Sequence, residues 1–463
     1  MALRRAALLA VLGCPILAYA QGVPGTSQSN PFQETSAGRA WQRITFGALD
    51  CQPGSGGATA FDCSQDAFTT SGVFANGTYR DIRFQYGGMP PGTPATADSL
   101  ANRVITQSQT FPQASSASGF TFTWGGGPTP TLDSELFGPL FGDRGRTNGR
   151  GKLSATLSVQ FLKWETLDDS EIRLNKPGLL WGDDAYSTDG SETLFGYVGR
   201  CRMNIDSVVA SLSFTYGIAD RVDVTVGAPL VHTKVEGSNE FLDYARLPGP
   251  RLSIDPADNG GFSPQGRYYV KGSSTGLGDV MVGVNWAFVK QPGTSLALAG
   301  RVNVGTGSFE DMTGTGETQW SGGLVGSLER GPFAPHFGVA YWGANDTLFD
   351  ELRSVLGVDY RAIPRRLTLS AEFLSRRLFD VQGFARTADF SFGTVTSPIT
   401  GDSFEVSNFQ AFRSGYALYF VNLGGKVRVT GQLLATAFVL IPWGSSGLIA
   451  QAPSYNFGLN YAF

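Results

Sequence analysis

Apolar and polar residues alternate along many short stretches of the chain after residue 152. In LSATLSVQF (153–161) every second side chain is apolar, and those between are Ser, Thr or Gln; VVASLSFTYG (208–217) repeats the pattern. A period of two is typical of a β-strand with one apolar face. The pattern predicts twelve strands, at 153–161, 208–217, 221–231, 279–289, 294–305, 318–329, 333–343, 351–361, 366–376, 415–429, 432–441 and 455–463.

The connections between these strands alternate in length. Tight links such as Lys290 to Gly293 and Arg330 to Pro332 contain Gly and Pro, which favour turns. The longer connections are 165–206, 233–275, 306–317, 344–350, 377–413 and 442–452. Short periplasmic turns, long outer loops and an even strand number are typical of transmembrane barrels. We therefore predict an all-β fold, a transmembrane antiparallel β-barrel of about 12 strands. A soluble β-sandwich is the alternative.

The last predicted strand, YNFGLNYAF, places large apolar groups on one face. They are Tyr455, Phe457, Leu459, Tyr461 and Phe463. On a transmembrane barrel this face would meet lipid, with aromatic rings at the membrane–water interface. The ending resembles the C-terminal assembly signal of bacterial outer-membrane proteins. That resemblance implies the barrel-assembly machinery as a partner.

The first residues, MALRRAALLAVLGCPILAYAQG, have the pattern of a secretory signal peptide. Arg4 and Arg5 precede an apolar stretch at 6–18, and Ala18-Tyr19-Ala20 forms a small-x-small cleavage site. We expect residues 1–20 to be removed and the chain to reach the outer membrane of a Gram-negative cell. Lipid attachment at Cys14, which ends the stretch VLGC, is the alternative.

Residues 21–148 alternate weakly and are rich in Gly and Pro, as in GGMPPGTPATAD. We predict an irregular N-terminal segment that either extends into the periplasm or plugs the lumen of a barrel formed by 149–463. Cys51 and Cys63 bracket QPGSGGATAFD, and we expect a disulfide between them in an oxidising compartment. Two unrelated thiols are the alternative.

Composition and charge narrow the function further. The chain has 61 Gly, 33 Phe and 15 Tyr but only 16% charged residues, which suits strands that expose one apolar face to lipid. A net charge of −4 disfavours binding to nucleic acid. Two His and the absence of a CxxC motif disfavour a Cys/His zinc site, and we expect no metal or cofactor.

Four phrases of the chain resemble a known family when taken together. They are FGPLFGDRGRTNGRGKLSATLSVQF (137–161), FTYGIADRVDVTVGAPLV (214–231), GLGDVMVGVNWAFV (276–289) and GPFAPHFGVAYWG (331–343). They resemble outer-membrane transporters linked to the meta-cleavage pathway of phenol degradation, which are related in architecture to long-chain fatty-acid transporters. The resemblance covers about 137–463. It implies a barrel and the passage of hydrophobic or aromatic compounds.

If the apolar face meets lipid, the opposite face of each strand lines the lumen. The polar residues of that face are Asp223, Asn285, Arg301, Asn303, Gln319, His336, Asp359, Glu372, Lys426 and Arg428. One interpretation is that these side chains pair across a narrow interior and fill it. The other is a selective polar path in which Arg301, Lys426 and Arg428 attract anions such as carboxylates.

Three functions remain open at this stage. The first is a porin-like channel for passive uptake of small hydrophobic or aromatic solutes, with no enzymatic activity. The second is a structural or adhesive barrel whose long loops bind partners or lipopolysaccharide in the surrounding lipid. The third is an interfacial esterase or phospholipase that uses His232, which would need a Ser within hydrogen-bond reach.

Overall fold

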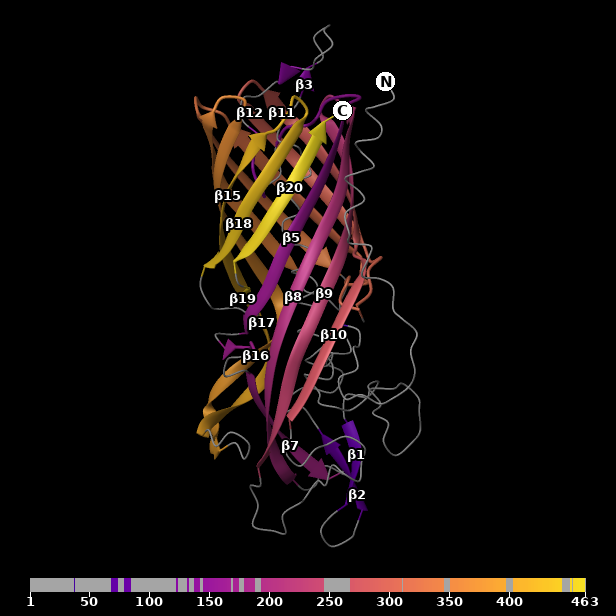
Figure 1. The fold of residues 1–463 in the computed structure, drawn as a ribbon, viewed down its shortest axis with the longest axis vertical. Coiled ribbons are helices and arrows are strands. Elements are labelled where there is room, and N and C mark those ends of the chain that lie inside the picture. The colour runs from indigo at the N-terminus through magenta and orange to yellow at the C-terminus, as the bar shows by residue number, and fades with distance from the viewer. Residues whose placement is uncertain are drawn as a thin grey trace. The chain divides into compact units, whose positions relative to one another are not determined.

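Figure 1 shows a computed structural model of the chain. Contacts divide the chain into the units Met1–Gln33 and Glu34–Phe463, and every described residue belongs to the second. The structure describes residues 37, 68–73, 79–84, 122–123, 131–132, 137–141, 145–167, 170–174, 179–187, 193–244, 267–309, 311–344, 350–396, 403–443, 450–451 and 453–462. The predicted signal peptide, Cys51, Cys63 and Phe463 lie outside these ranges.

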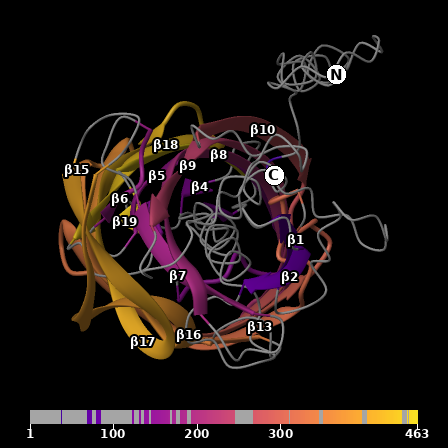
Figure 2. The ribbon, with the colours of Figure 1, turned by 90° about the horizontal axis from the view of Figure 1, so that it is seen from below.

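Twelve antiparallel strands close into a barrel (Figures 1 and 2). The wall consists of β5 (Leu153–Leu167), β8 (Thr193–Ala219), β9 (Val222–Tyr244), β10 (Arg267–Leu277) continued by β11 (Val280–Gln291), β12 (Thr294–Val304), β13 (Gln319–Leu328), β14 (Phe333–Ala344), β15 (Glu351–Ile363), β16 (Leu367–Thr396), β17 (Ser403–Arg428), β18 (Leu433–Trp443) and β20 (Ser454–Ala462). The last strand pairs with the first, from Tyr455 opposite Phe161 to Ala462 opposite Ser154. The predicted fold class is confirmed. None of the helices in the described ranges is long and apolar enough to cross a membrane.

Several strands are much longer than the alternation predicts. The alternation predicts loops at 165–206, 233–275 and 377–413. The strands β8, β9, β16 and β17 nevertheless run far into these stretches. In β16 and β17 the pairing continues, with irregularities, as far as Thr396 opposite Ser403. Beyond the lipid both faces of a strand meet water, so the alternation that marks a strand within the membrane is no longer required. The sequence pattern therefore records only the membrane part of each strand.

Short strands extend the sheet beyond the barrel wall. They are β1 (Phe68–Val73), β2 (Tyr79–Phe84), β6 (Ser170–Glu171), β7 (Leu179–Ser187) and β19 (Ala450–Gln451); β3 (Phe122–Thr123) and β4 (Thr131–Leu132) form a separate pair. The backbone of β7 pairs with the part of β8 that β5 does not reach. The backbone of β2 pairs with β7, and β1 pairs with β2. The strands β1 and β2 belong to the predicted N-terminal segment. They thus continue the sheet at the end of the barrel where β7 pairs with β8.

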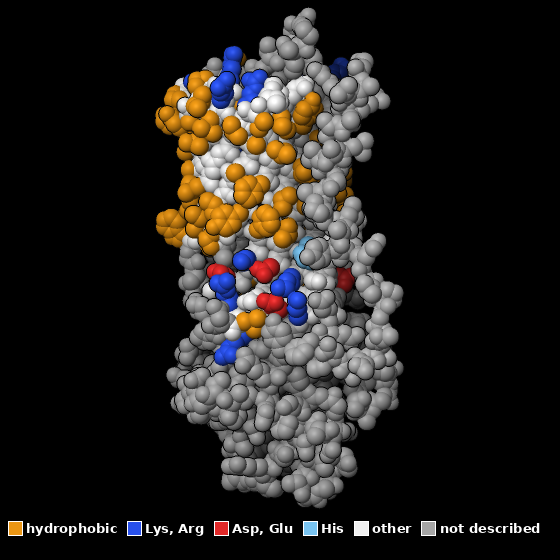
Figure 3. Space-filling model, in the orientation of Figure 1, with side chains coloured by type: hydrophobic (Ala, Val, Ile, Leu, Met, Phe, Trp, Pro, Cys, Tyr) orange, Lys and Arg blue, Asp and Glu red, His pale blue; other side chains and the backbone are white. Residues whose placement is uncertain are grey.

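The outer face of the barrel carries an apolar band (Figure 3). Outward side chains such as Trp286, Leu356 and Trp443 are exposed by 49%, 66% and 66%. On the face that Figure 3 shows, apolar side chains form two bands with a paler zone between, Lys and Arg lie at the upper edge, and charges of both signs lie below. Exposed apolar groups on this scale would be unstable in water but match a lipid bilayer.

The short connections lie together at one end of the barrel. Gly293 and Gly331 turn the chain there with positive φ angles of 77° and 61°, which glycine adopts without a steric penalty. At the β15–β16 turn Arg365 adopts φ 58°, a conformation less common for a residue with a side chain. By the usual asymmetry of such barrels, this end faces the periplasm. We call it the periplasmic end below.

One predicted outer loop folds inward. The connection 306–317 follows β12, and its Met312 is 2% exposed, with its carbonyl accepting a hydrogen bond from inward-facing Thr233 at 3.2 Å. Asp279, between β10 and β11, accepts the backbone N–H groups of Gly307 at 3.0 Å and Thr315 at 2.9 Å. The described part of this connection is therefore held against the inner wall, because the buried carboxylate of Asp279 binds it there.

Candidate functional site: the barrel lumen

Five polar side chains form a compact group on the inner wall in the periplasmic half of the barrel. We call this the inner cluster: His336, Asp359, Glu372, Asn422 and Lys426, which come from the neighbouring strands β14 to β17. Each of them is at most 5% exposed. Groups this deeply buried need hydrogen-bond partners, because desolvation without compensation costs several kcal/mol.

The inner cluster is held together by direct contacts. His336 Nε2 lies 3.2 Å from Glu372 Oε1, and His336 Nδ1 lies 3.7 Å from Asp359 Oδ2. Asn422 Nδ2 donates to Glu372 Oε2 at 2.7 Å. Gly357 lies between these strands, and a Cβ there would be 2.4 Å from His336 Nε2. The glycine therefore leaves the space in which the imidazole meets the carboxylate.

A segment of the chain before the first wall strand lies inside the barrel. We call residues 137–141 and 145–148 the luminal segment. Glu372 accepts the backbone N–H of Leu140 at 2.8 Å and that of Phe141 at 3.1 and 3.2 Å. Lys426 Nζ donates to the carbonyls of Pro139 at 2.6 Å and Phe137 at 3.4 Å. The inner cluster therefore binds the backbone of this segment with both an anion and a cation.

Apolar contacts add to these hydrogen bonds. The side chain of Phe137 is buried against Leu434 and Ala462, which point inward from β18 and β20. Leu140 is buried against Phe438 of β18. The Phe137 N–H also donates to Thr368 Oγ1 at 3.2 Å. Burying large side chains stabilises by about 1.5–3 kcal/mol each, so the segment is anchored and does not merely touch the wall.

The second part of the luminal segment binds the wall near the periplasmic turns. Asn148 N–H donates to Asp223 Oδ2 at 2.7 Å, and Thr147 Oγ1 donates to the Asp220 carbonyl at 2.8 Å. Arg146 forms an ion pair with Glu329 at 3.1 Å. Side chains of the wall thus hold the segment along its described length before it enters β5.

A second group of charges lies on the inner wall in the opposite half of the barrel. We call it the outer cluster: Arg301, Trp342, Glu351, Arg353 and Arg376. Glu351 Oε1 accepts from Arg376 Nε at 2.5 Å and from Arg353 Nε at 2.9 Å, and Oε2 accepts from both Nη2 atoms. The Arg353 guanidinium lies 4.1 Å from the centre of the Trp342 ring. This is a cation–π contact in a partly desolvated setting.

The structure groups the sequence-predicted lumen residues in three places. His336, Asp359, Glu372 and Lys426 belong to the inner cluster. Asp223 and Asn285 are paired in register on β9 and β11. Arg301 belongs to the outer cluster, and Asn303 and Gln319 are paired in register beside it. Arg428 lies apart at a periplasmic turn, where its Nε donates to the Thr430 carbonyl at 3.1 Å.

Sequence reasoning missed several residues of these clusters. Asn422 has the same parity as Lys426, and Arg376 has the same parity as Glu372, so alternation alone could have found both. Glu351 and Arg353 share the parity of Asp359 but begin a strand next to a predicted loop. The luminal segment had no such signal, since its partners follow it by more than 200 residues.

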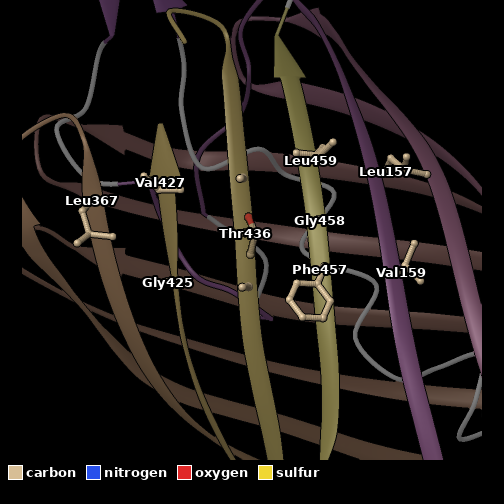
Figure 4. A pocket seen from close by; sticks show the side chains of 11 residues that line it. Leu157, Val159, Leu367, Gly425, Val427, Thr436, Phe457, Gly458 and Leu459 are labelled. Atoms are coloured by element: carbon tan, nitrogen blue, oxygen red, sulfur yellow. The ribbon is translucent and has the colours of Figure 1, made fainter. Parts of the chain in front are cut away.

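A shallow apolar hollow lies on the lipid-facing side of the wall (Figure 4). Outward side chains of β5, β16, β17, β18 and β20 surround the small residues Gly425, Ala435 and Gly458 there. Figure 4 shows Phe457 and Leu459 beside Leu157 and Val159 across the pair of strands that closes the barrel. With Tyr455, 53% exposed, these residues place the predicted assembly stretch on the lipid face.

His232 lies on the outer face near the rim, as its parity predicts. Its Nδ1 lies 2.7 Å from Thr275 Oγ1 on the paired strand β10. The esterase alternative requires a serine next to the imidazole, whereas the hydroxyl that contacts His232 belongs to Thr275. We therefore build the functional account on the lumen.

No protein-family model matches the chain, and no curated protein matches it. Among solved structures, the COG4313 outer-membrane channel from Pseudomonas putida F1 is 11% identical with a TM-score of 0.40, over 72% of this chain and 98% of that one. A Pseudomonas aeruginosa FadL homologue is 12% identical with a TM-score of 0.31, over 67% and 90%. A deletion mutant of the TodX monoaromatic hydrocarbon channel is 11% identical with a TM-score of 0.24, over 68% and 90%.

Identities of 11–12% and TM-scores of 0.40 or below leave the class of the protein to be defined by its own structure. An even number of antiparallel strands, closure without an edge and an apolar outer band define a transmembrane barrel of the bacterial outer-membrane type.

Proposed function

We propose that the protein is an outer-membrane channel for passive uptake of small hydrophobic or aromatic compounds, and that the luminal segment constricts its periplasmic half. The contact between the inner cluster and the backbone of residues 137–141 supports this most directly. A wall built only for strength would pair its own charges. Here Glu372 contacts His336 and Asn422 of the wall, but it also binds a separate segment of chain, as does Lys426. Releasing that segment would free lumen volume.

The polar inner face of the wall is consistent with the passage of solutes through the lumen. The inward positions of β5 from 154 to 160 carry Ser154, Thr156, Ser158 and Gln160, and the apolar Leu162 and Trp164 follow at the next two. Inward polar residues alternate with outward apolar ones in channels of this class.

A further contact joins the predicted N-terminal segment to the inner wall. Ala37, near the start of that segment, donates its N–H to inward-facing Ser274 at 2.9 Å. This contact supports a plug that spans more than the luminal segment.

A structural or adhesive barrel is the second candidate. The observation that favours it is the length of β16 (30 residues) and β17 (26 residues), which form a hairpin reaching far past the apolar band. Such a hairpin would present its backbone to a partner outside the cell. If the lumen passes no solute, this candidate becomes the better one.

Liposome swelling with the purified full chain tests the proposal. We expect neutral solutes to enter slowly with the native protein and several-fold faster with the double variant Glu372→Gln/Lys426→Met, which removes both charges that bind the luminal segment. Glu236→Gln, at an outward position of β9, is the matched control and should behave as the native protein. Absence of swelling with all three folded proteins would contradict a channel.

A further inference from the structure

The hollow of Figure 4 has a floor of small residues along β18. Ala435 and Ala437 occupy two successive outward positions of this strand, and Gly425 of β17 is opposite Ala437. The volume of the hollow is about 540 Å³, and apolar atoms line almost all of it. Larger side chains form its two sides, with Leu367 and Val427 on one and Phe457 and Leu459 on the other. An extended hydrocarbon chain along β18 would therefore meet carbon atoms beneath it and on both sides.

The hollow lies at the periplasmic margin of the apolar band. Leu367 is the first residue of β16, Val427 is the last but one of β17, and Ala435 is the third of β18. A strand advances by about 3.3 Å per residue, so the hollow begins close to the periplasmic turns. A hydrocarbon chain that fills it would therefore belong to a lipid whose headgroup lies on the periplasmic side.

Two arginines lie where the hollow meets these turns. Arg366 directly precedes Leu367, Arg428 directly follows Val427, and the Arg428 N–H donates to the Arg366 carbonyl at 2.9 Å. Arg366 is exposed, and half-buried Arg428 donates from Nε to the neutral carbonyl of Thr430. Among the residues that the structure describes, no carboxylate forms an ion pair with either guanidinium.

The surrounding sequence and surface have the same charge. The turns 361–366 and 428–432 contain no Asp or Glu. β18 and β20 lie on the face that Figure 3 shows, where Lys and Arg gather at the upper, periplasmic edge (Figures 1 and 3). The occupant of the hollow would therefore have its polar end in a positive environment.

This combination favours a lipid with an anionic headgroup. Guanidinium groups bind phosphate oxygens through paired hydrogen bonds, and a zwitterionic headgroup would add an ammonium that the arginines repel. A second copy of the chain is a poorer occupant. A two-fold axis along the membrane normal would bring its Arg366 and Arg428 to the same depth as the first pair, where like charges repel.

We propose that the hollow together with Arg366 and Arg428 is a binding site for one anionic phospholipid of the periplasmic leaflet. One acyl chain lies on Ala435 and Ala437, and the phosphate binds the two guanidinium groups. The lipid thereby contacts β16, β17, β18 and β20, beside the pair of strands that closes the barrel. The site does not depend on passage of a solute through the lumen.

Native mass spectrometry of the purified full chain in detergent tests the site. The probes are dioleoyl phosphatidylglycerol and dioleoyl phosphatidylethanolamine, which share their acyl chains and differ in headgroup charge. We expect the phosphatidylglycerol to bind at least about fivefold more tightly, because each basic residue near a headgroup strengthens the binding of an anionic lipid. Equal affinity for the two lipids would overturn the proposal.

A pair of double variants tests the arginines. Arg366→Gln/Arg428→Gln should lower the affinity for phosphatidylglycerol at least about fivefold and leave that for phosphatidylethanolamine nearly unchanged. Arg221→Gln/Arg330→Gln is the matched control, since it removes two exposed arginines from other periplasmic turns. Unchanged affinity in the first variant, or an equal loss in the control, would reject the site in favour of attraction by the whole rim.

A third comparison tests the hollow itself. Ala437→Leu fills part of the floor and should weaken both lipids several-fold, since the acyl chain loses its place. Ala228→Leu is the matched control, at an outward position of β9 opposite exposed Leu212. Unchanged lipid affinities in heat-modifiable Ala437→Leu protein would reject the hollow as the acyl-chain site. A dimer of the native protein that Ala437→Leu dissociates, with lipid binding unaltered, would assign the hollow to a second copy instead.

Discussion

Glu372 is the residue on which the account depends most. One carboxylate accepts hydrogen bonds from Leu140, Phe141 and Asn422 and lies beside His336. Alternation along its strand was enough to predict that it points inward. Its partners were out of reach of any sequence pattern, because they belong to an irregular segment that precedes it by 231 to 232 residues. Periodicity reports the face of a strand, not what lies against that face.

The first prediction concerns this carboxylate. Glu372→Gln removes the negative charge that binds the N–H groups of Leu140 and Phe141. Hydrogen bonds to charged groups contribute about 1.5–3 kcal/mol, so we expect these amides to exchange roughly tenfold faster or more. Hydrogen–deuterium exchange with mass spectrometry of peptides covering 137–141 measures this. Glu236→Gln should leave exchange there unchanged, and unchanged protection in Glu372→Gln would show that the apolar contacts alone hold the segment.

At the scale of elements, the membrane part of every wall strand was predictable and the remainder was not. Strands such as β13 and β14 were predicted within two residues at each end, because lipid requires an apolar side chain at every second position. Outside the lipid that requirement ends, and β16 and β17 continue unpredicted. The inward fold of 306–317 was also unpredicted, since it depends on one buried carboxylate, Asp279, which precedes its partners Gly307 and Thr315 by 28 and 36 residues.

The second prediction concerns the point where the luminal segment enters the wall. Gly217 of β8 approaches Gly149 so closely that a Cβ would lie 1.9 Å from the Gly149 carbonyl oxygen. Gly217→Ala should therefore displace the chain next to Asn148 and destabilise the barrel by roughly 1–3 kcal/mol, the usual cost of overpacking. Gly322→Ala, where a Cβ meets nothing within 4 Å, is the control. Urea unfolding followed by gel mobility compares the two, and equal stability would contradict the close approach.

The third prediction concerns the final strand. β20 pairs with β18 on one side and closes the barrel against β5 on the other. If Phe463, of the predicted assembly stretch, is recognised during assembly, its deletion should reduce the amount of heat-modifiable barrel in the outer membrane severalfold. Deletion of Gln21, at the start of the predicted N-terminal segment, is the control. Normal amounts of folded protein after deletion of Phe463 would reject the assembly role.

At the scale of the whole molecule, the outer band defines the environment and the lumen defines the function. The band was predictable, because its exposed residues are the apolar half of each alternating strand.

The fourth prediction concerns how the cost of a charged side chain varies with its depth in this band. Val284→Arg, in the middle of the lipid-facing part of β11, should destabilise the barrel by about 2–4 kcal/mol in lipid vesicles, whereas Val429→Arg at a periplasmic turn should cost about 0–1 kcal/mol. Equal costs by urea titration would contradict the assigned position of the membrane.

The most direct test of the central claim, a channel constricted by the N-terminal segment, is single-channel conductance in planar bilayers. Three proteins are compared: the full chain, the chain without residues 21–148, and the Glu372→Gln/Lys426→Met variant. We expect small or rare conductance steps for the full chain, the largest steps without the segment, and steps of intermediate size or frequency for the variant. Steps of the same size in all three would contradict the constriction, and folded proteins that produce no steps at all would contradict the channel.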